Sequence, residues 1–317
     1  MPRSLLPGQT SRLLVVDPRT ARSEIVFESD HSLVEAPNWS PDGAWLVVNA
    51  DGLLWRLEAP GAGSSASIGA GTGAGILHPI AMVGVPEINN DHVVSPDGGS
   101  IFVSAQDGHL YEVPFEGGAG RRVTREHPVG RGYKNYLHGV SPDGATLSVI
   151  VGARPDGSDD PATWRTNVAL VSVADGGTTF LTDDAHPDDG AEFSPDGAWL
   201  WFNSERWGHA PGHAQIGRMR VDGSHLGQVV ESGTVDWFPH VSPDGSQLLY
   251  LAFEAGTIGH PENRDVLLRL LDLDAGEPGA GVAPRDLLRL EGGQGTINVP
   301  GWAPDGGRFA CVDYPMG

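Results

Sequence analysis

Short apolar runs alternate with turn residues along the whole chain, and the alternation has a regular period. Runs such as Leu46–Val48 and Ile101–Val103 follow the tetrapeptide Ser-Pro-Asp-Gly, which recurs at positions 40–43, 95–98, 141–144, 194–197 and 242–245. A sixth copy at 303–306 has alanine in place of serine. Proline presets φ, aspartate bonds the backbone and glycine takes the left-handed conformation, so each copy predicts a tight turn between two strands.

The spacing of the turns predicts the architecture. Successive copies lie 46 to 61 residues apart, which is the period of propeller blades rather than of helical repeats. A second, looser hairpin follows each turn, and its first strands are expected at Leu53–Leu57, Leu110–Val113, Val168–Val173, Ile216–Arg220 and Val266–Leu270. Four strands per unit is the composition of a propeller blade.

The two ends of the chain complete the repeat. Leu13–Val16 and Glu24–Phe27 form a hairpin that lacks inner partners, and only Arg308–Val312 follows the last turn. Both ends are therefore expected to share one blade, which removes the exposed edges of the ring. The sequence predicts a single all-β domain over residues 1–317, a six-bladed β-propeller of four-stranded blades whose last blade is closed by the N- and C-terminal strands.

Composition narrows the function classes. With 20 Lys and Arg against 41 Asp and Glu, the net charge is −21, which excludes a nucleic acid or an anionic membrane as partner. Cys311 is the one cysteine and lies in an expected strand, so a buried, inert thiol is predicted and no disulfide framework exists. The chain has no apolar run long enough to span a membrane, and Met1–Arg12 lacks the apolar core of a secretory signal. We therefore expect a cytoplasmic protein.

The repeat carries a family resemblance. An aromatic residue precedes three of the turns, namely Trp39, Phe193 and Trp302, and the pattern resembles the TolB-type propeller repeat. Similar repeats occur in the propeller domains of prolyl oligopeptidase-like enzymes and in oligogalacturonate lyases. The resemblance covers the whole chain and implies a propeller fold, while the same fold serves binding modules and enzymes alike. No Gly-x-Ser-x-Gly motif of a peptidase is present, and the exported state and extra N-terminal domain of TolB are not visible.

Ligating side chains recur just before the turns, where the innermost strand of each blade borders the central channel. His92, His138, Glu192 and His240 occupy these positions in four consecutive blades. Imidazoles and a carboxylate on one axis predict a site for a divalent metal ion, Mn, Zn, Fe or Ca. The resemblance to oligogalacturonate lyases likewise implies histidines around a central metal.

The register of these four residues leaves an alternative. His92 and His138 lie three residues before their serine, whereas Glu192 and His240 lie two before theirs. Strict alternation would place the two sets on opposite faces of the blades, so they converge only if the strands are bulged. The alternative is a structural role, in which the four side chains hydrogen-bond to exposed backbone in the channel.

Further candidates lie at the same rim, where three long connections (Ala153–Asn167, Asn203–Gln215 and Phe253–Asp265) contrast with short ones in the first two blades. Basic side chains that could move a proton are Arg154, Arg165, Arg206 and His260. Side chains that could bind a ligand are Asn38, Asn90, Asp91, Asp189, Trp164, Trp207, Trp237, Gln294 and Asn298. Taken singly, Trp164 and Trp207 are better explained by packing the loops onto the blades, whereas the whole set of residues favours a pocket.

Two functions fit these observations. The first is a carbohydrate-active enzyme, a metal-assisted lyase or a related enzyme that abstracts a proton next to the carbonyl or carboxylate of a sugar or sugar acid. The second is a non-catalytic TolB-like propeller that binds a protein or a ligand at the same rim. The centre of a protein-docking surface is expected to be apolar, whereas here His, Asp, Glu and Asn gather, which favours the enzyme and a small carbohydrate-like ligand.

Overall fold

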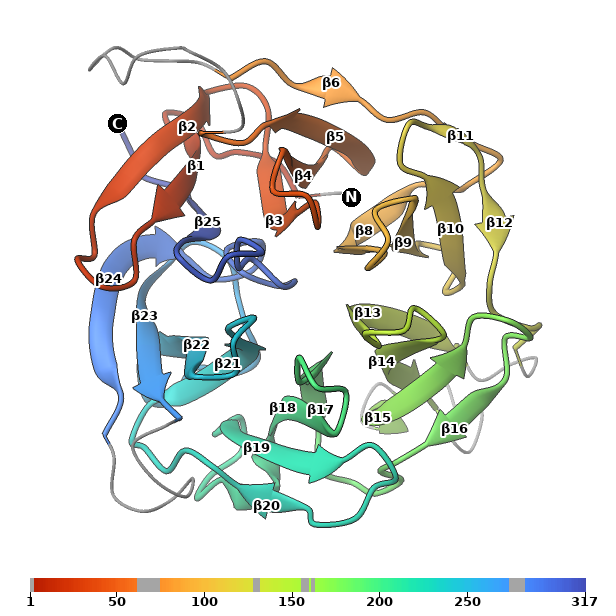
Figure 1. The fold of residues 1–317 in the computed structure, drawn as a ribbon. Coiled ribbons are helices and arrows are strands. Elements are labelled where there is room, and N and C mark those ends of the chain that lie inside the picture. Colours follow the sequence, from red (N-terminus) through yellow and green to blue (C-terminus); the bar gives the residue numbers. More distant parts are fainter. Residues whose placement is uncertain (1–2, 62–74, 128–131, 155–159, 161–162, 274–282) are drawn as a thin grey trace.

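Six β-sheets are arranged as a ring around a central channel (Figure 1). The computed structural model describes residues 3–61, 75–127, 132–154, 160, 163–273 and 283–317. Within these residues η2 (Glu205–Trp207) is a short 3₁₀ helix, and no helix is long and apolar enough to cross a membrane. The predicted all-β propeller is confirmed.

Five blades contain four antiparallel strands each, running in chain order from the inside of the ring outwards. The first is formed by β3 (Val34–Trp39), β4 (Trp45–Ala50), β5 (Leu53–Glu58) and β6 (His78–Pro79). The second is formed by β8 (Ile88–Val94), β9 (Ser100–Ala105), β10 (Leu110–Pro114) and β12 (Arg121–Arg122). The third is formed by β13 (Lys134–Val140), β14 (Thr146–Ala153), β15 (Arg165–Ser172) and β16 (Thr178–Phe180).

The fourth and fifth blades repeat the pattern. The fourth is formed by β17 (Asp188–Phe193), β18 (Trp199–Ser204), β19 (Gln215–Arg220) and β20 (Gly227–Gln228). The fifth is formed by β21 (Val235–Val241), β22 (Gln247–Phe253), β23 (Arg264–Asp272) and β24 (Arg285–Gly292). A short parallel pair, β7 (Met82–Val83) and β11 (Gly118–Ala119), lies outside this pattern.

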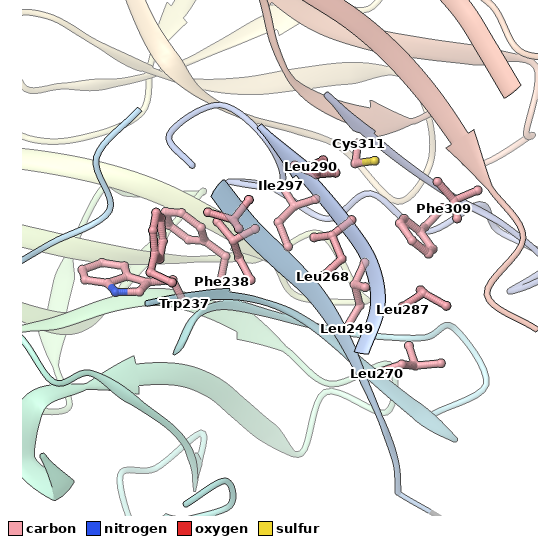
Figure 2. Close-up of a cluster of buried hydrophobic side chains, with 14 of the residues drawn as sticks. Trp237, Phe238, Leu249, Leu268, Leu270, Leu287, Leu290, Ile297, Phe309 and Cys311 are labelled. Atoms are coloured by element: carbon pink, nitrogen blue, oxygen red, sulfur yellow. The ribbon is translucent and has the colours of Figure 1, made fainter. Parts of the chain in front are cut away.

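The sixth blade is closed by both ends of the chain, as predicted. Its strands β25 (Phe309–Asp313), β1 (Ser11–Val16) and β2 (Ser23–Ser29) are antiparallel, and Leu13 lies opposite Val312. The innermost segment is held by an isolated bridge between Trp302 and Phe309 rather than by a regular ladder. Figure 2 shows how Leu249 and Leu268 of the fifth blade pack with Phe309 and Cys311 of the closing blade. The ring is therefore closed by apolar contacts as well as by strand pairing.

The repeated turns have the predicted geometry. In the first, Ser40 Oγ donates to Asp42 Oδ1 (2.5 Å), which also accepts from the amide of Ala44 (3.0 Å). The carbonyl of Ser40 accepts from the amide of Gly43, whose φ of 72° is one that glycine adopts without strain. These turns line one rim of the ring, and the inner strands begin at the opposite rim.

Each of the five inner strands contains a bulge. The sequence required such bulges if the side chains before the turns are to converge on the channel. The register of β3 shifts between Glu35 and Asn38, and β17 and β21 shift at the equivalent point. The shift lies between Ile88 and His92 in β8 and between Leu137 and Gly139 in β13. Two of the bulges place a non-glycine residue, Ala36 or Phe238, at φ 54°. Because bulges re-aim side chains, they decide which of the predicted residues face the channel mouth.

Candidate functional site

A cavity of about 340 Å³ lies at the rim where the inner strands begin. Its walls come from the inner segments of the second to sixth blades and from two of the long connections. The lining residues are Asn89, Asn90, Asp91, Tyr136, His138, Trp164, Thr166, Asp189, Phe238, His260, Gln294 and Asn298. Eight of them were predicted from the sequence; Asn89, Tyr136, Thr166 and Phe238 were not.

His138 and Asp189 form the charged centre of the cavity. His138 is buried, its Nδ1 faces the carbonyl of Asn298 (3.2 Å), and its Nε2 lies 2.9 Å from Asp189 Oδ1. Burial by itself would lower the pKa of His138, but Asp189 and the nearby Asp91 outweigh it and raise this pKa to about 9. Burial likewise opposes ionisation of Asp189, yet His138 and His260 hold the pKa of that carboxyl well below its usual range. The pair is therefore an imidazolium beside a carboxylate at neutral pH.

Asp91 is a second carboxyl with the opposite behaviour. Burial, together with the negative charge of Asp189, raises the pKa of Asp91 to about 6, although His138 opposes the shift. Asn89 holds the side chain, donating from Nδ2 to Asp91 Oδ2 (2.7 Å). One cavity thus contains two carboxyls whose pKa values are driven apart, an arrangement that suits general acid–base catalysis.

Three buried nitrogen atoms of the cavity residues have no hydrogen-bond partner within the described part of the chain: Asn90 Nδ2, His138 Nε2 and His260 Nδ1. His138 Nε2 is also one member of the ion pair with Asp189. Buried polar atoms are normally satisfied by protein, water or ligand. These nitrogens are therefore suited to bind a ligand that is rich in oxygen acceptors.

The aromatic wall of the cavity includes a strained residue. Phe238 is fully buried at φ 54°, and its ring lies 6.0 Å from the His138 ring and 5.1 Å from the His260 ring. A left-handed conformation is costly for a bulky side chain and is found mostly where function requires it. The conformation depends on tertiary packing, so no sequence pattern could have pointed to Phe238.

The predicted metal ligands do not form one ligand set. His92 is fully buried between backbone carbonyls, with Nδ1 3.1 Å from Asn90 O and Nε2 3.3 Å from Val47 O. Deeper in the channel, His240 faces Glu192 through Nδ1 and the carbonyl of Ile297 through Nε2. Among the described residues, no three His, Cys, Asp or Glu side chains are grouped closely enough to hold a metal ion.

The ring nitrogens of these histidines decide whether a metal ion can bind. Both ring nitrogens of His92 and of His240 already face carbonyl or carboxylate oxygens of the chain, so these two histidines do not fit the expected divalent ion. The structural alternative, hydrogen bonding within the channel, describes His92, Glu192 and His240.

The predicted rim arginines do not line the cavity. Arg206 is bound by Asp188 (2.9 Å), Asp184 (3.1 Å) and Ser204, and its role is therefore to hold the start of β17. Arg154 lies over the ring of Trp164 (5.6 Å), and Arg165 is exposed at the start of β15. None of the three predicted arginines is among the residues that line this cavity, so their catalytic role stays a prediction.

Three further predicted ligand-binding residues have structural roles. Asn38 donates to Pro300 O (2.6 Å) and accepts from Val94 N (2.7 Å), which joins three inner segments. Trp207 packs against Phe202 and over the backbone of Gly217, where a Cβ would lie only 2.0 Å from the ring. Trp237 is buried beside His260, 4.5 Å between ring centres, and supports the cavity from behind.

Two of the three long connections contribute to the cavity. Trp164 comes from the β14–β15 connection, Thr166 from the start of β15 and His260 from the β22–β23 connection. Trp164 also packs closely on Gly152, so the binding and packing interpretations both hold for it. Residues 155–159 and 161–162 of the first connection lie outside the described residues. The third connection, Asn203–Gln215, contributes no lining residue.

Comparison with known proteins identifies close relatives along the full length. No family model matches the chain. The uncharacterized protein Atu1656 of Agrobacterium fabrum is 36% identical over 314 residues, spanning 97% of this chain and 94% of that protein. A structure from Agrobacterium tumefaciens, solved as a candidate TolB, is 34% identical with a TM-score of 0.80, and the match covers 97% of this chain and 99% of that one.

More distant structures share the fold alone. An oligogalacturonate lyase in complex with manganese has a TM-score of 0.51 at 15% identity, covering 80% of this chain and 65% of that one. A second oligogalacturonate lyase, from Vibrio parahaemolyticus, has a TM-score of 0.54 at 14% identity, covering 89% and 74%. At such identities the comparison supports the propeller architecture and no shared chemistry.

Proposed function

The chain belongs to the family of TolB-like six-bladed β-propellers. On that premise we propose that its channel cavity binds a small sugar and transfers a proton at the carbon next to the sugar's carbonyl group. The observation that carries the proposal is the meeting of Asp91, His138 and Asp189 in one cavity, with protonation states suited to acid–base work.

The walls of the cavity favour a neutral, polyhydroxylated ligand. The unpaired nitrogens of Asn90, His138 and His260 are suited to hydroxyl and carbonyl oxygens. Phe238 and Trp164 offer apolar faces on which the C–H face of a sugar ring could pack. A volume of about 340 Å³ lies at the small end of ligand pockets and fits one sugar unit. Because no arginine among the described residues lines the cavity, a neutral sugar suits it better than the sugar acid that the sequence also allowed.

The chemistry follows from the charge states. Above pH 6, Asp91 is ionised and can take the proton from the carbon next to the carbonyl group. The electron pair left behind moves onto the carbonyl oxygen, where the imidazolium of His138 can donate a hydrogen bond or a proton. Asp189 keeps that imidazolium charged. Return of the proton from Asp91 to the same carbon completes an exchange. Return to the former carbonyl carbon completes an isomerisation, in which His138 first gives its proton to the carbonyl oxygen and then takes one from the neighbouring hydroxyl group.

Deuterium exchange tests the proposal. A panel of neutral aldoses and ketoses in deuterium oxide, followed by ¹H NMR, should contain a sugar that loses its signal at the carbon next to the carbonyl when the protein is added. His138→Gln and Asp91→Asn should each slow this exchange by roughly 10²- to 10⁴-fold. The matched control is His186→Gln, since His186 is exposed near the start of β17 and lines no part of the cavity.

Two results of the exchange experiment would overturn the proposal. Absence of exchange with every sugar, or exchange that survives in both cavity variants, would contradict it. That outcome would favour the second candidate, a non-catalytic TolB-like propeller that binds a partner at this rim.

A further inference from the structure

A second cavity, of about 220 Å³, adjoins the first. The two cavities share Asn89, Asn90 and Gln294 as lining residues. Gln294 forms the partition: its Nε2 donates to Asn90 Oδ1 (3.1 Å) and its Oε1 accepts from Asn298 Nδ2 (3.1 Å). Only side-chain hydrogen bonds hold the Gln294 side chain in this position.

The second lobe is acidic. Glu35, Asp51 and Glu87 line it, against one cationic side chain, that of Arg3. Arg3 is already paired with Glu35, at 2.8 Å between Nη1 and Oε1. Asp51 and Glu87 have no ion-pair partner in the part of the chain that the structure describes, and Glu87 lies across Gly52, where a Cβ would be 2.6 Å from its Cγ. Two carboxylates therefore remain for a ligand.

Arg3 shows the kind of group that this lobe accepts. Its guanidinium also donates to the carbonyl of Gln294 (2.5 Å) and lies 4.1 Å from the centre of the Tyr314 ring. A carboxylate, a carbonyl and an aromatic face thus surround a cation supplied by the chain itself. The remaining volume lies next to Asp51 and Glu87, whose carboxylates attract a cation from outside.

The junction of the lobes presents an unpaired donor. Asn90 lines both lobes and is 6% exposed, and its Nδ2 has no partner among the described residues. An oxygen atom of a ligand that passes from one lobe to the other would accept from this group. A glycosidic oxygen between two sugar units meets that requirement.

We propose that the substrate is a two-unit glycoside that carries an amine, with the neutral unit in the first lobe and the amine-bearing unit in the second, beside Asp51 and Glu87. The inference rests on the proposed function of the first lobe and names the class of its substrate: an amino sugar joined through oxygen to a neutral sugar. Asn90 binds the linking oxygen, and Gln294 moves aside to admit the second unit.

Isothermal titration with matched ligands tests the inference. Cellobiose and the β-1,4-linked disaccharide of glucosamine share one linkage and differ in their amino groups. Glucose and glucosamine serve as single-unit references, and the galactose and mannose counterparts of each monosaccharide extend the panel. The amine-bearing disaccharide should bind roughly tenfold more tightly than cellobiose at low salt. This preference should shrink severalfold in Glu87→Gln and in Asp51→Asn, since each removes one carboxylate.

The control is Glu254→Gln, which removes the same charge from an exposed residue of the β22–β23 connection that lines neither lobe. It should leave the preference unchanged. Asp51 has φ 54°, a conformation that asparagine also tolerates, so Asp51→Asn should not disturb the backbone. Equal affinity for the amine-bearing and neutral disaccharides would overturn the inference while leaving the proposed function standing. Failure of every sugar to bind would overturn both.

Discussion

His92 and His138 are both buried imidazoles, yet their surroundings drive their pKa values in opposite directions. Burial lowers the pKa of His92 to about 4, because its neighbours are backbone carbonyls that offset only part of the cost. Burial acts on His138 too, but Asp189 and Asp91 outweigh it, and the pKa rises to about 9. Residue type alone therefore did not separate a structural histidine from one at the site; the distribution of carboxylates did.

The first prediction at this scale is a bell-shaped pH dependence of kcat/KM. Activity should rise with pH as Asp91 ionises near pH 6 and fall as the imidazolium of His138 loses its proton near pH 9. Exchange rates measured from pH 4 to 10 check this. A profile without a limb near pH 9 would contradict the role given to His138.

The second prediction separates a structural His92 from a metal ligand. His92→Ala should lower the free energy of unfolding by about 1–3 kcal/mol, because Asn90 O and Val47 O lose a buried partner. A chelator should leave the melting temperature of the natural protein unchanged. Since the folded pKa of His92 lies below its unfolded value, its contribution is present above about pH 6.5 and is lost as pH falls towards 4. Urea denaturation at several pH values measures this, and a drop in melting temperature on chelation would contradict it.

At the scale of strands and turns, local and non-local features differ in how far the sequence predicts them. The Ser-Pro-Asp-Gly turn is specified by its own four residues, so its geometry and position were predictable. The bulges of the inner strands depend on packing against neighbouring blades, and a shift of one residue changes which side chains face the channel. That is why His138 lies at the cavity while His92, at the same distance from its turn, lies between blades.

The connection Asn203–Gln215 gives the prediction at this scale. It was expected to overhang the site, but Arg206 instead pairs with Asp188, a carboxylate that is only 1% exposed. Arg206→Ala should therefore destabilise the protein by about 3 kcal/mol, since it leaves a buried charge unpaired. Sugar affinity should stay within about twofold, because the connection contributes no lining residue. Thermal denaturation and titration calorimetry measure the two effects. Loss of binding without loss of stability would restore the expectation that this connection is functional.

At the scale of the whole molecule, closure of the ring couples every blade to its neighbours. The pairing of β1 with β25 joins residues that are about 300 positions apart, and the core around Phe309 joins the fifth and sixth blades (Figure 2). This closure was predictable because the repeat left an unpaired hairpin at one end and a single strand at the other. The cavity draws on five blades, and eight of its lining residues were predictable from their place before the turns or in the long connections, whereas the bulges that aim them were not.

Truncation after Asp305 tests the closure. The variant lacks β25, so β1 loses its inner partner and the hydrophobic cluster loses Phe309 and Cys311. The melting temperature should fall by more than about 10 °C, since the whole ring depends on this blade. Differential scanning calorimetry measures the change. An unchanged melting temperature would show that the blades are stable without closure.

The measurement that tests the central claim most directly is NMR of the histidine side chains during titration with sugars. If the cavity around His138 is where the ligand binds, addition of sugar should shift the ring signals of His138 and His260, while those of His92 and His225 stay unchanged. Without sugar, the His138 signal, identified by its absence in His138→Gln, should titrate near pH 9. A His138 signal that titrates near pH 6.5 and does not respond to any sugar would contradict the account.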